Sequence, residues 1–164
     1  MNNLDQILSR VLDAEKLQMK LNEWKKENKR IVFTNGVFDI LHLGHVDYLS
    51  KAADEGDILI IGVNSDSSVK MLNKGSSRPI NDEKSRSVLI ASLNFVDAVV
   101  LFDEDTPYNL IRMVVPDVLV KGSDYKPEDI VGYDIVSETG GSIKTIDFLP
   151  GYSTTNIERK IKNS

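Results

Sequence analysis

The chain has 164 residues, of which 41% are hydrophobic and 27% charged, and it contains no cysteine. This length and composition are typical of one domain with its own core, and the missing cysteines exclude disulfides, thiolate metal sites and a cysteine nucleophile. A net charge of -5 argues against nucleic acid as a partner. Neither a signal peptide nor a membrane span of ~20 apolar residues is present, so we expect a cytoplasmic protein without a membrane partner.

The first predicted element is an amphipathic helix from Leu4 to Glu27, whose apolar residues recur at helical spacing. We assign residues 1–28 to this helix as part of the same domain, and residues 29–164 to the functional domain. Five β-rich runs then alternate with helical stretches. The predicted strands are Arg30–Thr34, Asp57–Val63, Ala98–Leu101, Val118–Val120 and Ser142–Ile146, and the predicted helices are Gly44–Ala53, Ser65–Leu72, Glu83–Leu93, Pro107–Val114, Pro127–Glu138 and Ser153–Ile161.

Alternating strands and helices predict an α/β fold, a single Rossmann-like domain with a five-stranded parallel sheet flanked by helices. Ligands in such sheets bind beyond the carboxyl ends of the strands. Polar and glycine residues follow the predicted strands: Asn35-Gly36 the first, Asp66 the second, and Lys121-Gly122 with Asp124 the fourth. The stretch from Asn73 to Asn81 is predicted to be a mobile loop at the edge of this site.

The two histidines of the chain, His42 and His45, are three residues apart at a predicted helix start, so their side chains share one face. Gly44 between them lets a phosphate approach the backbone N–H groups. This arrangement predicts a polyphosphate site. Two alternatives stay open: a pair that only caps and packs, and a metal site, although two histidines alone leave a zinc ion short of ligands.

Two longer motifs resemble the signatures of a known protein family. Residues 34–45, TNGVFDILHLGH, resemble the first signature of the cytidylyltransferase-like nucleotidyltransferases, and residues 151–157, GYSTTNI, resemble the second. Two signatures in the right order are more specific than either alone. Within that superfamily, the stretches 63–66, 78–81 and 119–128 resemble the adenylyltransferase module of ADP-heptose synthase, and the likeness covers nearly the whole chain.

The resemblance implies an adenylyltransferase. Residues 29–164 would form a nucleotidyltransferase domain that transfers AMP from ATP to D-glycero-D-manno-heptose 1-phosphate, giving ADP-heptose and pyrophosphate for lipopolysaccharide or another surface glycan. It implies Mg²⁺ or another divalent cation with ATP as co-substrate, and it is compatible with a homo-oligomer. Because the segment before this module is one predicted helix, a separate heptose 7-phosphate kinase would supply the substrate. Val37 and Ser123 depart from the family pattern, where cysteine and glycine are common, and this bears on substrate preference.

The resemblance also assigns roles to residues. His42, His45 and Lys121 would be catalytic. The two histidines would contact the ATP phosphates, and Lys121 would reach these phosphates or the heptose phosphate. Asp39 would hold a metal ion or order the substrate. The residues expected to bind nucleotide or phosphate are Asn35, Gly36, Phe38, Gly44, Arg86, Gly122, Ser153, Thr154 and Thr155, and those expected to bind substrate are Asp39, Asp66 and Asp124. Simpler interpretations are helix caps at Asp39, Asp66 and Ser153 and a solvated helix position at Arg86.

Other functions also fit these motifs. A cytidylyltransferase acting on glycerol 3-phosphate or a similar alcohol phosphate would share both signatures. An ATP-binding regulatory module without turnover would use the same sheet, although binding alone does not require two imidazoles. A tRNA synthetase fragment is disfavoured by the acidic charge.

Overall fold

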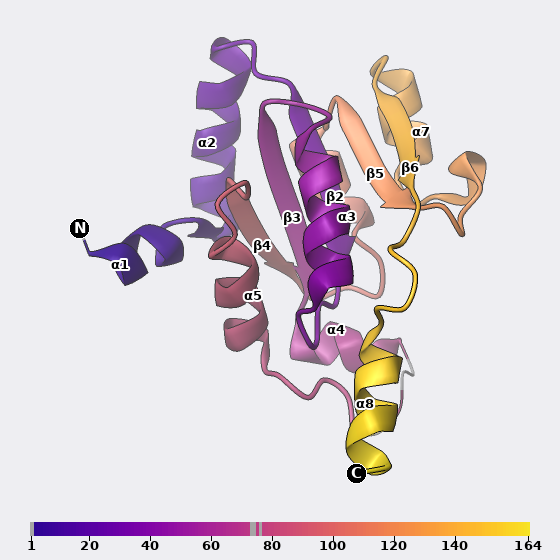
Figure 1. The fold of residues 1–164 in the computed structure, drawn as a ribbon. Helices are drawn as coiled ribbons and strands as arrows, with labels where there is room; N and C mark the ends of the chain where they lie inside the picture. Colours follow the sequence, from indigo (N-terminus) through magenta and orange to yellow (C-terminus); the bar gives the residue numbers. More distant parts are fainter. Residues whose placement is uncertain (1, 73–74, 76) are drawn as a thin grey trace.

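Six parallel strands form one sheet in the order β1-β4-β3-β2-β5-β6, with helices on both faces (Figure 1). The structure is a computed structural model that describes residues 2–72, 75 and 77–164. The strands are β1 (Val11–Leu12), β2 (Ile31–Gly36), β3 (Ile58–Asn64), β4 (Ala98–Phe102), β5 (Val118–Gly122) and β6 (Ser142–Ile146). The α/β class and the five predicted strands are confirmed, but the sheet has six strands, so the prediction of five was wrong.

The additional strand lies within the segment that was predicted to be one helix from Leu4 to Glu27. This segment divides into α1 (Asn3–Leu8), β1 and α2 (Ala14–Lys26). The pairing of β1 with β4 aligns Val11 with Val99, and Asp13 caps α2 by accepting a hydrogen bond from the Lys16 N–H at 2.8 Å. Val11 and Leu12 suit either a helix or a strand, and pairing with β4 decides between the two.

The remaining helices cover the sheet or extend beyond it. They are α3 (Leu43–Ala53), α4 (Asp66–Met71), α5 (Glu83–Ala91), α6 (Tyr108–Val114), α7 (Tyr133–Glu138) and α8 (Thr154–Lys162). The predicted helix over Pro127–Glu138 is a short 3-10 turn (Pro127–Asp129) followed by α7. Gly132 separates the two with φ +89°, a left-handed conformation that ends helical geometry. In the described part of the chain, no helix has the length and apolarity to cross a bilayer.

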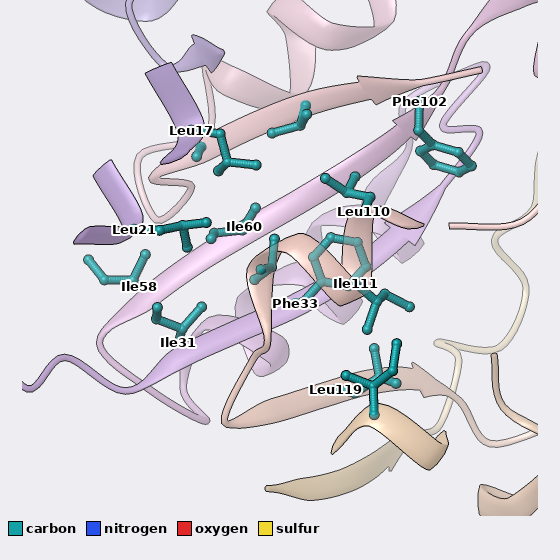
Figure 2. Packing of buried hydrophobic residues seen from close by; sticks show 14 of the residues in the cluster. Leu17, Leu21, Ile31, Phe33, Ile58, Ile60, Phe102, Leu110, Ile111 and Leu119 are labelled. Atoms are coloured by element: carbon teal, nitrogen blue, oxygen red, sulfur yellow. The ribbon is translucent and has the colours of Figure 1, made fainter. Parts of the chain in front are cut away.

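Alternate residues of the strands point to opposite faces of the sheet, as the two-residue period of a strand requires. Ile31 and Phe33 pack with Leu17 and Leu21 of α2 in the cluster shown in Figure 2. Val32, between them in the sequence, packs on the other face with residues of α3 and α5. Both faces of the central strands are therefore covered, which explains their nearly continuous apolar sequences.

The order of the strands reverses at β2. The chain moves from β2 outward to β3 and β4, and then returns to the other side of β2 with β5 and β6. Strands β2 and β5 pair through Val32 with Val118 and Phe33 with Leu119. Their carboxyl ends are adjacent at this reversal, which is where open α/β sheets form ligand sites.

Candidate active site

A cavity of about 1010 Å³ opens beyond the carboxyl ends of β2 and β5. Its walls come from the segment after β2, the start of α3, the end of β5 and the segment from β6 to α8. Every predicted site residue except Asp66 and Arg86 lines it. These lining residues are Asn35, Gly36, Phe38, Asp39, His42, Gly44, His45, Lys121, Gly122, Asp124, Ser153, Thr154 and Thr155. The fold thus brings the two sequence motifs to one cavity.

The two histidines are stacked at the start of α3. Their ring centroids are 3.8 Å apart with an interplanar angle of 18°. His42 is the N-cap residue of α3, and its carbonyl accepts a hydrogen bond from the His45 backbone N–H. Among the described residues, the Nδ1 atoms of both rings are buried and have no hydrogen-bond partner. A polar ligand in the cavity would give these nitrogens the partner that buried polar atoms normally have.

Burial also keeps both rings neutral near pH 7. Desolvation lowers the pKa of His42, and it lowers the pKa of His45 to about 4, with a further contribution from the nearby His42. A hydrogen bond with the backbone of Ile40 acts on His45 in the opposite direction but is the smaller effect. A neutral imidazole carries one N–H donor and one acceptor nitrogen. The hydrogen bond with Ile40 uses the N–H of His45, so in the neutral pair His42 is the ring that can donate a hydrogen bond to an anion.

Phe38 packs its ring edge against His45, with centroids 5.3 Å apart. This position requires a left-handed backbone at Phe38, where φ is +51°, which is unusual for a bulky residue. It also requires a glycine nearby, because a Cβ at Gly36 would lie 2.9 Å from Phe38 Cζ. Gly36 at the end of β2 therefore allows an aromatic ring to pack against the second histidine.

Lys121 brings a cation to the same edge of the sheet. It lies on β5, and its Nζ donates a hydrogen bond to Asn35 Oδ1 on the neighbouring strand β2. Next to it, the ring of Phe148 lies over Gly122, where a Cβ would be 2.2 Å from Phe148 Cζ. A side chain at residue 122 would therefore displace that ring from the cavity wall.

The start of α8 forms another part of the wall. Ser153 caps this helix, because its Oγ accepts a hydrogen bond from the Asn156 N–H at 3.0 Å. Gly151 precedes it with φ +86° and makes the turn into the helix. A Cβ on Gly44 would lie 3.1 Å from Tyr152 Cβ, so the starts of α3 and α8 are close together. Two helix N-termini thus contribute residues to one cavity, and their dipoles favour an anion.

The carboxylate of Asp39 is buried and already has protein partners. It accepts hydrogen bonds from the Ile80 and Asn81 backbone N–H groups, and Arg78 Nη1 lies 2.8 Å from its Oδ2. Burial alone would raise the pKa of this carboxyl, but the two N–H groups and the guanidinium outweigh burial and lower the pKa. Coordination of a metal ion by Asp39 stays a prediction.

Arg86 is a buried residue that pairs with the half-buried Asp66 outside the cavity lining. Arg86 is 1% exposed, which excludes the solvated helix position. Its Nη1 donates to the Val37 and Asn64 carbonyls, its Nε to the Asn81 carbonyl, and its Nη2 to Asp66 at 2.8 Å. The guanidinium thus ties the ends of β2 and β3 to the segment before α5. Direct contacts of these two side chains with phosphate or substrate stay predictions.

No cluster of three or more His, Asp or Glu side chains able to hold a metal ion occurs among the residues that the structure describes. A Mg²⁺ ion that arrives with ATP needs no such cluster, because the phosphates and water supply most of its oxygen ligands. The cavity therefore fits a nucleotide-bound cation better than a resident metal centre.

Four aromatic residues of the cavity were not among the predicted site residues: Tyr48, Tyr125, Phe148 and Tyr152. Tyr48 shares a hydrogen bond of 2.9 Å with Thr34, and burial raises the pKa of its phenol to about 12. Its position three residues after His45 on α3 could have indicated it, because such residues share a helix face. No sequence signal indicates Phe148, which follows an edge strand. Of the predicted mobile loop, residues 73, 74 and 76 lie outside the described residues.

Comparison with known proteins agrees with both motifs. The sequence model of the family described as cytidylyltransferase-like matches residues 33–160. Among curated relatives, a bifunctional protein HldE of Nitratiruptor sp. is 54% identical over 153 residues, which cover 93% of this chain and 32% of the relative. The HldE of Campylobacter jejuni subsp. jejuni is 56% identical, covering 85% of this chain and 29% of the relative. The chain thus spans about a third of the length of these relatives.

Two solved structures share the fold of this chain. A lipopolysaccharide core biosynthesis protein from Thermoplasma volcanium is 32% identical with a TM-score of 0.59, and the match covers 74% of this chain and 97% of that protein. A pantoate-beta-alanine ligase from Francisella tularensis, complexed with an ATP ligand, has a TM-score of 0.62 over 93% of this chain and 76% of the ligase. At 18% identity this second match shows a shared fold only.

Proposed function

The chain belongs to the cytidylyltransferase-like family, and on that premise we propose that it transfers AMP from ATP to D-glycero-D-manno-heptose 1-phosphate. The products would be ADP-heptose and pyrophosphate. The observation that carries the proposal is the stacked pair of neutral histidines, His42 and His45, in a cavity that two helix N-termini also line. Such a site offers hydrogen-bond donors and dipoles to a polyphosphate.

The relatives support the choice of substrate. Proteins named bifunctional share about half of their aligned residues with this chain but match it over only about a third of their length. That pattern suits one catalytic module of a two-activity protein. A structural relative is named for lipopolysaccharide core biosynthesis, which is a use for an activated heptose. The stretches 63–66, 78–81 and 119–128 favour the adenylyl and heptose activity over the cytidylyl activity.

The reaction requires stabilisation of charge more than proton transfer. An oxygen of the sugar phosphate attacks the α-phosphorus of ATP, and the bond from that phosphorus to the oxygen bridging the β-phosphate breaks. The electron pair leaves with pyrophosphate. Because the attacking phosphate is already anionic, no general base is needed, and the barrier comes from bringing anions together and from charge growing on the leaving group.

The chain's own residues can meet these demands. His42 and His45 would contact the ATP phosphates, His42 by donating its N–H, and Lys121 adds a flexible positive charge at the end of β5. The first turn of α8, with Ser153 to Thr155, would hold the β- and γ-phosphates at its positive end. The rings are stacked before ATP arrives, so they need little reorganisation in the transition state.

Mg²⁺, when bound with ATP, would neutralise charge on the phosphate oxygens. Asp39 is the carboxylate of the first motif that lines the cavity, and Asp124 is another carboxylate there. We propose that a second enzyme activity, a heptose 7-phosphate kinase, supplies the sugar phosphate. Assembly into a homo-oligomer is a further proposal that rests on the family.

The direct test is pyrophosphate release by the purified chain with Mg²⁺. ATP and CTP are each combined with both anomers of heptose 1-phosphate and with glycerol 3-phosphate. We expect release with ATP and one heptose 1-phosphate only. Release with CTP and glycerol 3-phosphate would assign a cytidylyltransferase instead. ATP binding without release from any acceptor would favour a regulatory module, and a chelator added to the active mixture tests the need for the cation.

A further inference from the structure

Arg78 makes two ion pairs that join elements on either side of the cavity. Its Nη1 lies 2.8 Å from Asp39 Oδ2, and its Nη2 lies 2.8 Å from Glu158 Oε2 on α8. The exposed fractions of the side chains are 16% for Arg78, 3% for Asp39 and 23% for Glu158. Because both arms of a planar guanidinium are used, its orientation is fixed at two points. Arg78 therefore connects the segment before His42 to α8.

Several hydrogen bonds fix the position of Asp39, the first partner of Arg78. The Asp39 carboxylate also accepts the N–H groups of Ile80 and Asn81, and the Asn81 side chain donates back to the Asp39 carbonyl. From below, Arg86 Nε donates to the Asn81 carbonyl at 3.0 Å. Asp39 and Arg86 thus bind the segment that contains Arg78 to the body of the protein.

By contrast, α8 has few other attachments. None of its residues is buried, and its apolar Ile161 is 66% exposed. In the described part of the chain, the pair between Arg78 and Glu158 is the ion pair that α8 makes with another element. Figure 1 shows α8 extending beyond the carboxyl edge of the sheet. Its place beside the cavity therefore depends strongly on Glu158.

We propose that Arg78 is a positioning residue that, through Glu158, holds the first turn of α8 where it can bind the phosphates of ATP. The inference rests on the proposed function, because it takes ATP as the ligand of this cavity. Glu158 lies four residues, about one turn, after Thr154, so an anchor there restrains the cavity-lining residues Ser153 to Thr155 directly.

If Glu158 anchors α8, its removal should change the affinity for ATP in the direction opposite to that expected from its charge alone. Removing a carboxylate from a helix that binds a polyanion reduces repulsion and should strengthen ATP binding. Loss of the anchor should weaken ATP binding, because the first turn of α8 must then be ordered when the ligand arrives. The sign of the change at Glu158 therefore distinguishes positioning from general electrostatics.

The test compares Glu158→Gln with the unsubstituted chain by calorimetric titration with ATP and Mg²⁺. We expect the Kd for ATP to rise about fivefold, which corresponds to about 1 kcal/mol. The matched control is Asp147→Asn, which removes an exposed carboxylate between β6 and α8 that has no ion pair among the described residues. Its Kd should be unchanged or lower. Glu158→Asp keeps the charge and should recover part of the affinity.

Hydrogen exchange gives a second readout that does not depend on ATP. In Glu158→Gln without nucleotide, we expect faster amide exchange in residues 153–162 and unchanged exchange in β2 and β5. Unchanged ATP affinity together with unchanged exchange would overturn the inference. If the unsubstituted chain fails to bind ATP, the proposed function falls, and the exchange experiment still decides whether Arg78 holds α8.

Discussion

At the scale of single residues, we expect substitutions in the histidine pair to lower activity and to leave stability nearly unchanged. His42 and His45 are half-buried in the cavity lining, where their rings stack and Phe38 packs against His45. We expect His42→Ala or His45→Ala to lower kcat for pyrophosphate release by about 10²-fold or more, the usual effect of losing one preorganised donor. The Tm should change little. An equal loss of stability and activity would instead support the alternative in which the pair only caps and packs.

The pKa of His45 predicts how stability depends on pH. Histidine in an unfolded chain titrates near pH 6.5, whereas burial lowers the pKa of His45 to about 4. Between these values the unfolded chain binds more protons, so the free energy of unfolding falls as the pH falls through this window. Above about pH 6.5 the contribution is fully present. We expect it to amount to about 1–2 kcal/mol after allowance for partial solvent access.

Thermal unfolding of the wild type and of His45→Asn at pH 4.5 to 7.5 measures this effect. The difference between the two curves isolates the histidine, and the variant should lose less stability on acidification. Asp39 does not interfere, because its lowered pKa makes its contribution disappear only below about pH 3.8. Parallel curves for the two proteins would show that His45 titrates normally in the folded state.

Two roles can be tested for Arg86: binding of a phosphate, and structural support of the surrounding backbone. Its guanidinium donates to three backbone carbonyls and to Asp66, so Arg86→Met would leave those acceptors without donors. We expect the free energy of unfolding, measured by urea denaturation, to fall by about 3 kcal/mol or more. Arg112→Met, at an exposed position, is the control and should change it by less than about 0.5 kcal/mol. Normal stability with a raised KM for ATP would identify a phosphate ligand.

At the scale of elements, the first turn of α3 affects both the stability of the helix and the position of the histidines proposed to be catalytic. Gly44 is its second residue, and alanine favours a helix over glycine by up to about 1 kcal/mol. However, a Cβ there would lie 3.0 Å from His42 Cε1 and Nδ1, so the ring must move. We expect Gly44→Ala to keep or raise the Tm while kcat falls about tenfold.

Measurements of Tm and kcat on the same preparations of Gly44→Ala test whether stability is kept while turnover falls. Ser50→Ala, on the same helix and away from the cavity lining, is the control and should leave kcat unchanged. If kcat of Gly44→Ala equals that of the wild type, the position of the His42 ring does not limit the reaction.

The elements also show what the sequence could predict. The strands with long apolar runs, β2 and β3, were predicted within two residues at each end, because their burial on both faces leaves a local signal. β1 was missed because two residues carry no period, and their assignment as a strand depends on pairing with distant β4. Likewise, the motifs predicted thirteen of the residues that line the cavity, but not its tyrosines or Phe148. The partners of Asp39 and Arg86 arise from tertiary contacts.

At the scale of the whole molecule, the N-terminal segment completes the core. Residues 2–28 precede the region matched by the family, but Leu17 and Leu21 of α2 are fully buried against the sheet. We therefore predict that residues 1–28 and 29–164 unfold as one unit. Leu17→Ala should lower the free energy of unfolding by about 2–5 kcal/mol. Met19→Ala, at a position 59% exposed on the same helix, should change it by less than about 0.5 kcal/mol.

The single tryptophan makes this prediction measurable. Trp24 lies on α2 and packs against the core cluster, so its fluorescence reports on the N-terminal segment. Far-ultraviolet circular dichroism reports on all helices and strands. In urea, the two signals should follow one transition with the same midpoint, and Leu17→Ala should shift both together. An earlier fluorescence transition would mean that α2 detaches first, so that residues 29–164 hold the active site without it.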